Sequence, residues 1–292
     1  MTAPFGARLA AAMDDHGPLC VGIDPHASLL DAWGLADDAD GARTFGLRVV
    51  EAVGGRVAAV KPQAAFFERH GSRGVAALED VIAAARAAGT LVVVDAKRGD
   101  IGSTMDAYAE AFLRDGSPLA GDALTVSPYL GFGSLSPAVD LALSSGRGLF
   151  VLCLTSNKEG HEVQHARTPV DGAAHERGEV GASVASTIAA HAAALNADVH
   201  PLGSIGLVVG ATVGDAAART GTDLTAVNGP LLAPGVGAQG AGATELTAVF
   251  GRARRQVLAS SSRGVLRAGP DVASLRRAAD EAGAEARAAL RG

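Results

Sequence analysis

Residues 92–104 read VVVDAKRGDIGST, and this stretch decides the interpretation of the fold. Three valines lead into a segment with four charged residues, and a helix-like pattern follows. A strand this apolar is typical of a parallel sheet covered on both faces. A period of two would place Asp95 and Lys97 on one side of its C-terminal end, where we expect them to pair. The C-terminal ends of parallel strands are where α/β proteins usually carry their chemistry.

Lysine is rare in this chain, because only Lys61, Lys97 and Lys158 occur among 25 lysines and arginines. Two of the three, Lys61 and Lys97, end apolar strand-like runs. A lysine ammonium can release a proton near neutral pH, whereas a guanidinium cannot. The distribution therefore points to chemistry at these two lysines. An arginine-rich composition that keeps lysines at strand ends for solubility would give the same pattern.

Composition excludes several classes of function. A net charge of −6 gives no basic surface for nucleic acid. No apolar run reaches the roughly 18 to 20 residues of a membrane helix, and the first residues lack the layout of a signal peptide. Cys20 and Cys153 lie in apolar runs, as buried reduced thiols do. We expect a soluble cytoplasmic protein.

Short apolar runs alternate with alanine-rich helical stretches along the whole chain. We expect strands at Leu19–Asp24, Arg56–Lys61, Leu91–Lys97, Ala123–Ser127, Leu149–Thr155, Ile205–Gly210, Leu231–Pro234 and Val257–Ser261. We expect helices at Gly74–Ala88, Ser103–Arg114, Val180–Asn196, Thr244–Arg254 and about Asp271 to Leu290, with Asp271 as N-cap. Eight such units favour an α/β fold with one domain over residues 1–292, a (β/α)8 TIM barrel. A doubly wound open sheet is the alternative. Residues 156–204 form a longer insertion whose polar part, 158–179, resembles a surface loop.

Two short motifs are decoys. Residues 235–240 (GVGAQG) fit the dinucleotide fingerprint, but they lie near the C-terminus and the next strand ends in serines instead of an acidic residue. Residues 161–165 (HEVQH) fit the zinc-protease pattern, which needs a stable helix and a third ligand. We therefore expect neither a dinucleotide nor a metal, although the glycine amides could still bind an anion.

The loops after the seventh and eighth strands favour a phosphate site. They are residues 234–240 and 260–264, and in (β/α)8 barrels phosphate often binds between these two loops. The first offers backbone amides and Gln239. The second offers Arg263, whose guanidinium suits a bidentate phosphate contact. The alternative interpretation is that both loops are simply tight turns between strand and helix.

The first three strands each end in charge. Barrel closure would gather the alternating set Asp24, Lys61, Asp95, Lys97 and Asp100. Neighbouring carboxylates favour the charged ammonium, so we expect Lys97 to be a proton donor. A structural ion-pair network is the other interpretation, but it leaves the phosphate loops without a purpose. A lysine that donates a proton next to a phosphate-binding site fits proton transfer at a carbon of a sugar phosphate or a nucleotide.

These residues resemble the orotidine 5′-phosphate decarboxylase family, in its longer bacterial subgroup. The most specific match is residues 95–104 (DAKRGDIGST), which fit the family pattern D-x-K-x-x-D-I-x-x-T. Supporting matches are residues 23–24, 60–62, 127–131, 233–237 and 262–264. The resemblance implies a homodimeric barrel that converts orotidine 5′-monophosphate to UMP without metal or organic cofactor.

The resemblance also implies a role for each matching residue. Asp95 would lie against the substrate carboxylate while Lys97 protonates C6. Asp24 and Lys61 would bind the ribose, and Ser127 would bond the pyrimidine amide. The phosphate would be held by Gln239 and Arg263, with Pro234, Gly237 and Gly264 in the same loops. Asp100, Ile101 and Thr104 would reach into the partner subunit's site. No tyrosine of the kind found in the family's shorter forms lies near Gln239.

Three alternatives remain open at this point. A metal-dependent hexulose-phosphate synthase would use a similar D-x-K-x-x-D cluster. A non-catalytic nucleotide-binding protein would bind UMP without turnover. Asp100 and Thr104 share one helix face and could simply cap their own helix.

Overall fold

The chain folds into a closed barrel of eight parallel strands. A computed structural model describes residues 3–170, 172, 180–236 and 242–291. The strands are β1 (Leu19–Ile23), β2 (Ala59–Pro62), β3 (Leu91–Arg98), β4 (Ala123–Val126), β5 (Gly148–Leu154), β6 (Ile205–Val209), β7 (Leu231–Pro234) and β8 (Val257–Ser261). Each pairs with the next in the chain, and β8 returns to β1, where Leu19 pairs with Ala259. The predicted (β/α)8 barrel is confirmed, and the open sheet is excluded.

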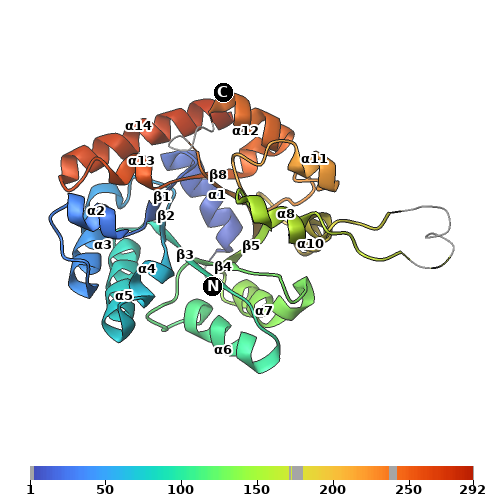
Figure 1. The fold of residues 1–292 in the computed structure, drawn as a ribbon, viewed down its shortest axis with the longest axis horizontal. Coiled ribbons are helices and arrows are strands. Elements are labelled where there is room, and N and C mark those ends of the chain that lie inside the picture. Colours follow the sequence, from blue (N-terminus) through green and yellow to red (C-terminus); the bar gives the residue numbers. More distant parts are fainter. Residues whose placement is uncertain (1–2, 171, 173–179, 237–241, 292) are drawn as a thin grey trace.

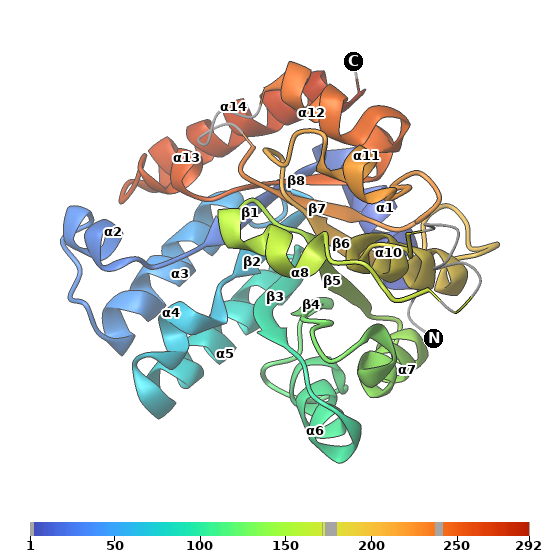
Figure 2. The same ribbon diagram turned by 45° about the vertical axis from the view of Figure 1, so that its right-hand side comes forward.

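Helices surround the barrel and separate successive strands (Figures 1 and 2). The α-helices are α1 (Phe5–His16), α2 (Ala27–Ala32), α3 (Ala39–Val53), α4 (Ala64–Glu68), α5 (Gly71–Ala87), α6 (Gly102–Leu113), α7 (Ser136–Ser144), α8 (His161–Gln164), α10 (Val184–Leu195), α11 (Ala216–Thr220), α12 (Ala243–Phe250), α13 (Arg263–Leu266) and α14 (Val272–Arg291). Short 3₁₀ turns are η1 (Phe132–Leu135), η2 (Lys158–Gly160) and η3 (Gly251–Gln256).

Several predicted boundaries move for local reasons. The helix expected from Val180 begins at Val184, because the Ser183 hydroxyl accepts a hydrogen bond from the Ser186 amide and caps it. The helix expected to reach Arg254 ends at Phe250 and continues as the 3₁₀ turn η3. Asp271 does cap α14, since its carboxylate accepts a hydrogen bond from the Ser274 amide at 2.8 Å.

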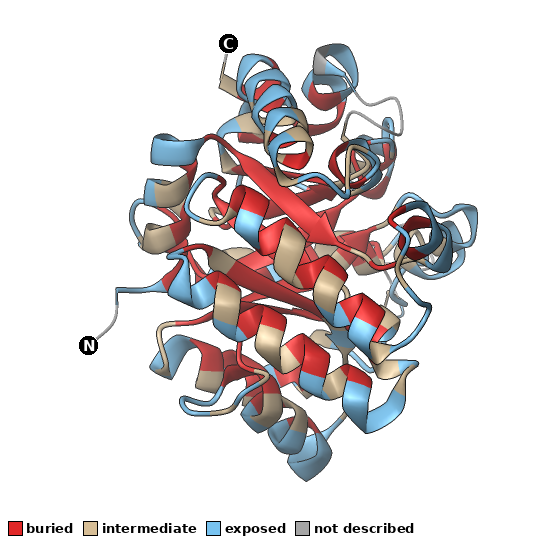
Figure 3. Ribbon diagram, turned by 90° about the vertical axis from the view of Figure 1, so that its left-hand side faces the viewer, coloured by how far each residue is buried: buried red, intermediate tan, exposed pale blue. Residues whose placement is uncertain are grey.

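Two apolar cores hold the barrel together. The larger lies between the strands and the outer helices, whose outward faces are exposed (Figure 3). The smaller lies inside the barrel and is closed at its N-terminal end by α1, which inserts Phe5, Leu9 and Met13 among strand side chains. The rings of Phe5 and Phe150 meet edge to face at 6.0 Å. With this end sealed, the opening lies at the C-terminal ends of the strands.

The insertion at residues 156–204 contains the helix predicted from Val180 and, in addition, short helical turns in the part expected to be a surface loop. It contains η2, α8 and α10, and an arm whose two sides are joined at Arg167 and Ser183 extends away from the barrel (Figure 1). Within the described part of the chain, no helix has the length and apolar character needed to cross a membrane.

Candidate active site

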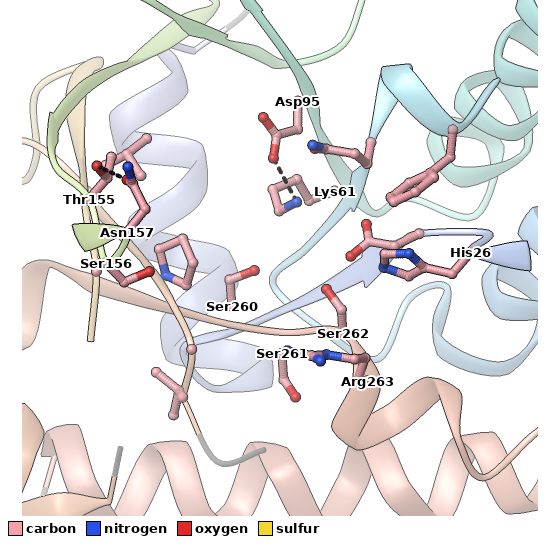
Figure 4. A pocket seen from close by; sticks show the side chains of 18 of the residues that line it. His26, Lys61, Asp95, Thr155, Ser156, Asn157, Ser260, Ser261, Ser262 and Arg263 are labelled. Atoms are coloured by element: carbon pink, nitrogen blue, oxygen red, sulfur yellow. Dashed lines mark hydrogen bonds and ion pairs between the residues drawn. The ribbon is translucent and has the colours of Figure 1, made fainter. Parts of the chain in front are cut away.

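A polar pocket of about 860 Å³ opens at the C-terminal ends of the strands (Figure 4). It brings together Asp24, Lys61, Asp95 and Lys97, the charged residues that follow or end the first three strands. On the opposite side lie Pro234, Gly235, the serines at 260–262, Arg263 and Arg267. The pocket therefore joins four of the five residues of the predicted charged cluster, all but Asp100, to the loops after β7 and β8.

Asp95 is the centre of the charged side. Its carboxylate accepts a hydrogen bond from Lys61 Nζ at 2.8 Å and from Lys97 Nζ at 2.6 Å. Burial by itself would raise the pKa of Asp95, but the two ammonium groups hold it well below its ordinary value. The carboxylate therefore stays ionised and fixes both cations.

Lys61 is buried, whereas Lys97 keeps 44 % of its side chain exposed. Burial by itself would lower the pKa of Lys61, but the carboxylates of Asp95 and Asp24 raise it above its ordinary value. Burial also raises the pKa of the nearby Cys20 thiol to about 12, so this thiol stays protonated. The exposed ammonium that faces the pocket is that of Lys97.

The C-terminal end of β3 is irregular, although its side chains keep the predicted sides: Val94 and Ala96 pack in the outer core, and Asp95 and Lys97 line the pocket. The register between β3 and β4 shifts between Val94 and Arg98, and Lys97 has a left-handed backbone with φ of 46°. Asp95 and Lys97 thus meet on one side of the strand and pair, as predicted, although the strand end itself is irregular. A bulge of this kind re-aims side chains next to active sites.

Asp24 lies at the junction between the two sides. Its Oδ1 atom is buried and has no hydrogen-bond partner among the described residues. Leaving a buried carboxylate oxygen without a hydrogen bond costs free energy, and a ligand that donates a hydrogen bond to it would remove that cost. Beside it, Gly22 leaves room for Ser262, because a Cβ at Gly22 would lie 1.9 Å from the Ser262 hydroxyl.

The structure also places residues in the pocket that the sequence analysis missed. The Gln63 amide nitrogen is 2.5 Å from Oδ2 of Asp95 in the orientation that satisfies both ends of the amide. The His26 ring packs against Phe66 with centroids 4.2 Å apart, and both rings line the pocket. From the predicted insertion at 156–204 come Ser156, Asn157 and Gln164, which form the far wall together with Thr155.

Some predicted site residues lie elsewhere. Ser127 does not line the polar pocket; it belongs to a neighbouring, more apolar pocket of about 500 Å³, and its amide donates to the Arg98 carbonyl. Gly264 lines a small adjacent pocket. Gly237 and Gln239 lie outside the described residues.

Asp100, Ile101 and Thr104 are absent from the pocket lining of their own chain. Asp100 accepts a hydrogen bond from the Ile101 amide, and no side chain caps α6. The structure thus does not support the simple capping alternative. Ile101 is 61 % exposed.

The HEVQH motif builds no metal cluster among the described residues. His161 and His165 lie at the two ends of α8 with ring centroids 6.5 Å apart. No group of three potential His, Cys, Asp or Glu ligands occurs in the ranges that the structure describes.

Comparison with known proteins agrees with this geometry. Residues 17–278 match the profile of the orotidine 5′-phosphate decarboxylase / HUMPS family. The chain belongs to this family. It is 63% identical over 287 residues to an orotidine 5′-phosphate decarboxylase of Streptomyces coelicolor, covering 98% of each chain. It is 59% identical over 288 residues to that of Salinispora arenicola, covering 99% of each.

Solved structures extend the comparison. A crystal structure from Streptomyces avermitilis matches with a TM-score of 0.92 and 63% identity, covering 100% of this chain and 97% of that one. The orotidine monophosphate decarboxylase of Leishmania donovani matches with a TM-score of 0.75 and 33% identity, covering 99% and 100%. The family resemblance predicted from residues 95–104 is confirmed.

Proposed function

We propose that the Lys61–Asp95–Lys97 array carries out the decarboxylation of orotidine 5′-monophosphate to UMP, the reaction of the family's orotidine 5′-phosphate decarboxylases. The observation that carries this proposal is an ionised, buried Asp95 that holds an exposed Lys97 ammonium at the mouth of the barrel. The pocket is large enough for a nucleotide, and cationic groups line its other side.

The reacting step needs only the charges that the array supplies. The bond between C6 and the carboxylate breaks, CO₂ leaves, and the electron pair stays on C6. Lys97 Nζ gives C6 a proton and later regains one from solvent. An ammonium fixed beside the developing negative charge stabilises the transition state more strongly in a closed site than in water. Asp95 orients Lys97 and lies against the substrate carboxylate.

The ribose and the pyrimidine would bind between the two sides of the pocket. The unpartnered Oδ1 of Asp24 suits a ribose hydroxyl donor, and Lys61 lies beside it. The pyrimidine amide needs a polar partner on the opposite wall. Ser156 lines that wall and Ser127 does not, so Ser156 takes the role that the sequence analysis gave to Ser127.

The phosphate would bind at the loops after β7 and β8. Arg263 and Arg267 lie one helical turn apart and both line the pocket, near Pro234. The guanidinium of Arg263 can hold a phosphate by charge-assisted hydrogen bonds, and the exposed Arg267 adds positive charge nearby. Gly237, Gln239 and Gly264, in the same loops, remain candidates for phosphate binding. Binding energy from this remote group can be expressed in the rate of the chemical step.

The activity is tested by following the loss of orotidine 5′-monophosphate absorbance on addition of purified protein with excess chelator. We expect full turnover, because every group named above is a side chain of this protein. Activity that the chelator abolishes would favour a metal-dependent sugar-phosphate enzyme. Tight UMP binding without turnover would indicate a nucleotide-binding protein.

We also propose that two chains build each active site. Asp100 is half-buried and does not line its own pocket, while Ile101 and Thr104 are exposed at the start of α6. Tyr129 and Leu130 after β4 are exposed by 75% and 54%. Large apolar side chains exposed together with a helix start at the catalytic rim favour a two-fold contact in which Asp100, Ile101 and Thr104 enter the partner's site.

Subunit exchange tests this shared site. Homodimers of Asp100→Ala and of Lys97→Ala should each be nearly inactive. Mixed dimers would carry both lesions in one site and leave the other intact. Random exchange should restore about a quarter of wild-type activity per total site, since about half the dimers are mixed. Verified exchange with no recovered activity would show that Asp100 acts within its own subunit.

A cytoplasmic location completes the proposal. Cys20 and Cys153 are both free and buried, as expected in a reducing compartment. The substrate is a small nucleotide, and we propose neither nucleic acid nor membrane as a partner.

A further inference from the structure

The irregular end of β3 lies opposite a single residue of β4. The two strands pair at Val94 and Leu124, and again at Arg98 and Val126. Three β3 residues, 95–97, therefore lie opposite Thr125 alone. This bulge contains both Asp95 and Lys97, so whatever fixes its shape also fixes the two charged groups.

The Thr125 side chain occupies the position opposite the bulge and is 1 % exposed. Its hydroxyl accepts a hydrogen bond from the Lys97 backbone amide at 3.0 Å and donates one to Oδ1 of Asp95 at 2.9 Å. A hydroxyl has one proton, and accepting from the amide leaves that proton for the carboxylate. One group therefore bonds to the backbone of Lys97 and to the side chain of Asp95.

The backbone bond matters because Lys97 is held in the left-handed region, with φ of 46°. That conformation is unfavourable for a residue with a long side chain and persists only where the surroundings determine it. On the far side of the bulge, the Arg98 carbonyl accepts a hydrogen bond from the Ser127 amide at 2.7 Å. Within the bulge itself, the backbone is held by the hydrogen bond from the Lys97 amide to Thr125.

We infer that Thr125 is a positioning residue, which holds Lys97 Nζ and the Asp95 carboxylate in their reacting geometry. The inference rests on the proposed roles of those two residues. Thr125 is not among the residues that line the pocket, so it acts through its neighbours. Its β-branched side chain has few rotamers, which keeps the hydroxyl aimed at both partners. Its loss should therefore affect turnover more than ligand binding.

The test compares Thr125→Val, which removes the hydroxyl at nearly constant shape, with Thr125→Ser, which keeps it. Thr90→Val is the matched control, because the buried Thr90 hydroxyl also accepts a backbone amide bond, from Gly55 at 2.6 Å, just before β3 begins. For each variant we would measure kcat, KM, the dissociation constant of UMP and the melting temperature.

We expect Thr125→Val to lower kcat by about 10- to 100-fold, the range for loss of a hydrogen bond to a charged group. UMP affinity should stay within about threefold, and Thr125→Ser should keep kcat within about threefold of wild type. Thr90→Val should lower the melting temperature without lowering kcat. If the valine variant does not fold, Thr125→Cys replaces it, because a thiol is a weak hydrogen-bonding group.

Two results would overturn the inference. One is a kcat of Thr125→Val, or of its cysteine substitute, that stays within about threefold of wild type. The other is a serine variant that loses as much as the valine variant, which would assign the effect to packing. Failure of the proposed function looks different, because Lys97→Ala would then keep wild-type turnover or the wild type would show none.

Discussion

The two sides of the pocket differ in how their charges are paired. On the side formed by β2 and β3, Lys61, Asp95 and Lys97 already satisfy one another within 2.8 Å. On the side formed by the loops after β7 and β8, Arg263 and Arg267 are exposed and form no ion pair with a described carboxylate. The first side is preorganised for chemistry, and the second is ready for an anion that arrives with the substrate.

The largest expected effect breaks the preorganised side. Lys97→Arg keeps the positive charge but cannot release its proton near neutral pH. General acid catalysis is worth about 10² to 10⁴ in rate, and we expect kcat to fall by at least that factor. Steady-state turnover of orotidine 5′-monophosphate measures it. Turnover within about tenfold of wild type would contradict the role of Lys97.

The next effect concerns the stability that the same pairing provides. Lys61→Met leaves the buried Asp95 with one cation, and breaking a buried pair costs about 3–5 kcal/mol of unfolding free energy. Urea denaturation at neutral pH measures the loss. The control is Arg56→Met, because the exposed Arg56–Asp280 pair at 3.2 Å should contribute less than about 1 kcal/mol. Equal losses of unfolding free energy in the two variants would show that the buried ion pair contributes no more to stability than the exposed one.

The pairing also predicts how stability depends on pH. The folded-state pKa of Asp95 lies below its ordinary value, so its contribution is present above about pH 4 and is lost as the pH falls further. The pKa of Lys61 is raised, so its contribution is present below about pH 10 and is lost as the pH rises through the raised value. Urea titrations across pH should show a shallower acid slope in Lys61→Met than in the wild type.

On the anion side, Arg263→Ala should weaken UMP binding by about 1.5–3 kcal/mol, as for a lost hydrogen bond to a charged group. Uridine has no phosphate, and its affinity should change little. Calorimetric titration of both ligands separates the two cases. Equal weakening of UMP and uridine would mean that Arg263 supports the barrel and does not bind the anion.

The smallest expected effect is that of Arg267→Ala. This guanidinium lies one turn further along α13 and is exposed, so we expect a loss of less than about 1 kcal/mol in UMP affinity. The loss should shrink further at high salt, because screening acts on exposed charges. A loss as large as that of Arg263→Ala would show that both arginines grip the phosphate directly.

The fold could be predicted from the alternation of apolar runs with helical stretches, since every predicted strand is present and β7 and β8 have the predicted bounds. Asp24, Lys61 and Asp95 were found because each stands at the end of an apolar strand. The same rule applies to Ser156 and Asn157 after β5, which were instead assigned only to the start of the insertion at 156–204. Gln63 lies two residues beyond Lys61 and shares its side of the strand, a signal that was available.

Other features could not be found in this way. Thr125 was not singled out, because nothing in the strand pattern shows that a bulge places residues 95–97 of β3 opposite it. A bulge changes which residue faces which, and periodicity assumes that it is absent.

Closure of the barrel by β1 and β8 has a consequence for how the protein is made. Leu19 pairs with Ala259, and the pocket combines Asp24 from the first turn of the barrel with Ser260 and Arg263 from the last. During translation the free edge of β1 is therefore covered only after almost the entire chain has been synthesised. A product truncated before Val257 lacks the closing strand and the pocket residues Ser260 and Arg263, and its open strand edges invite aggregation.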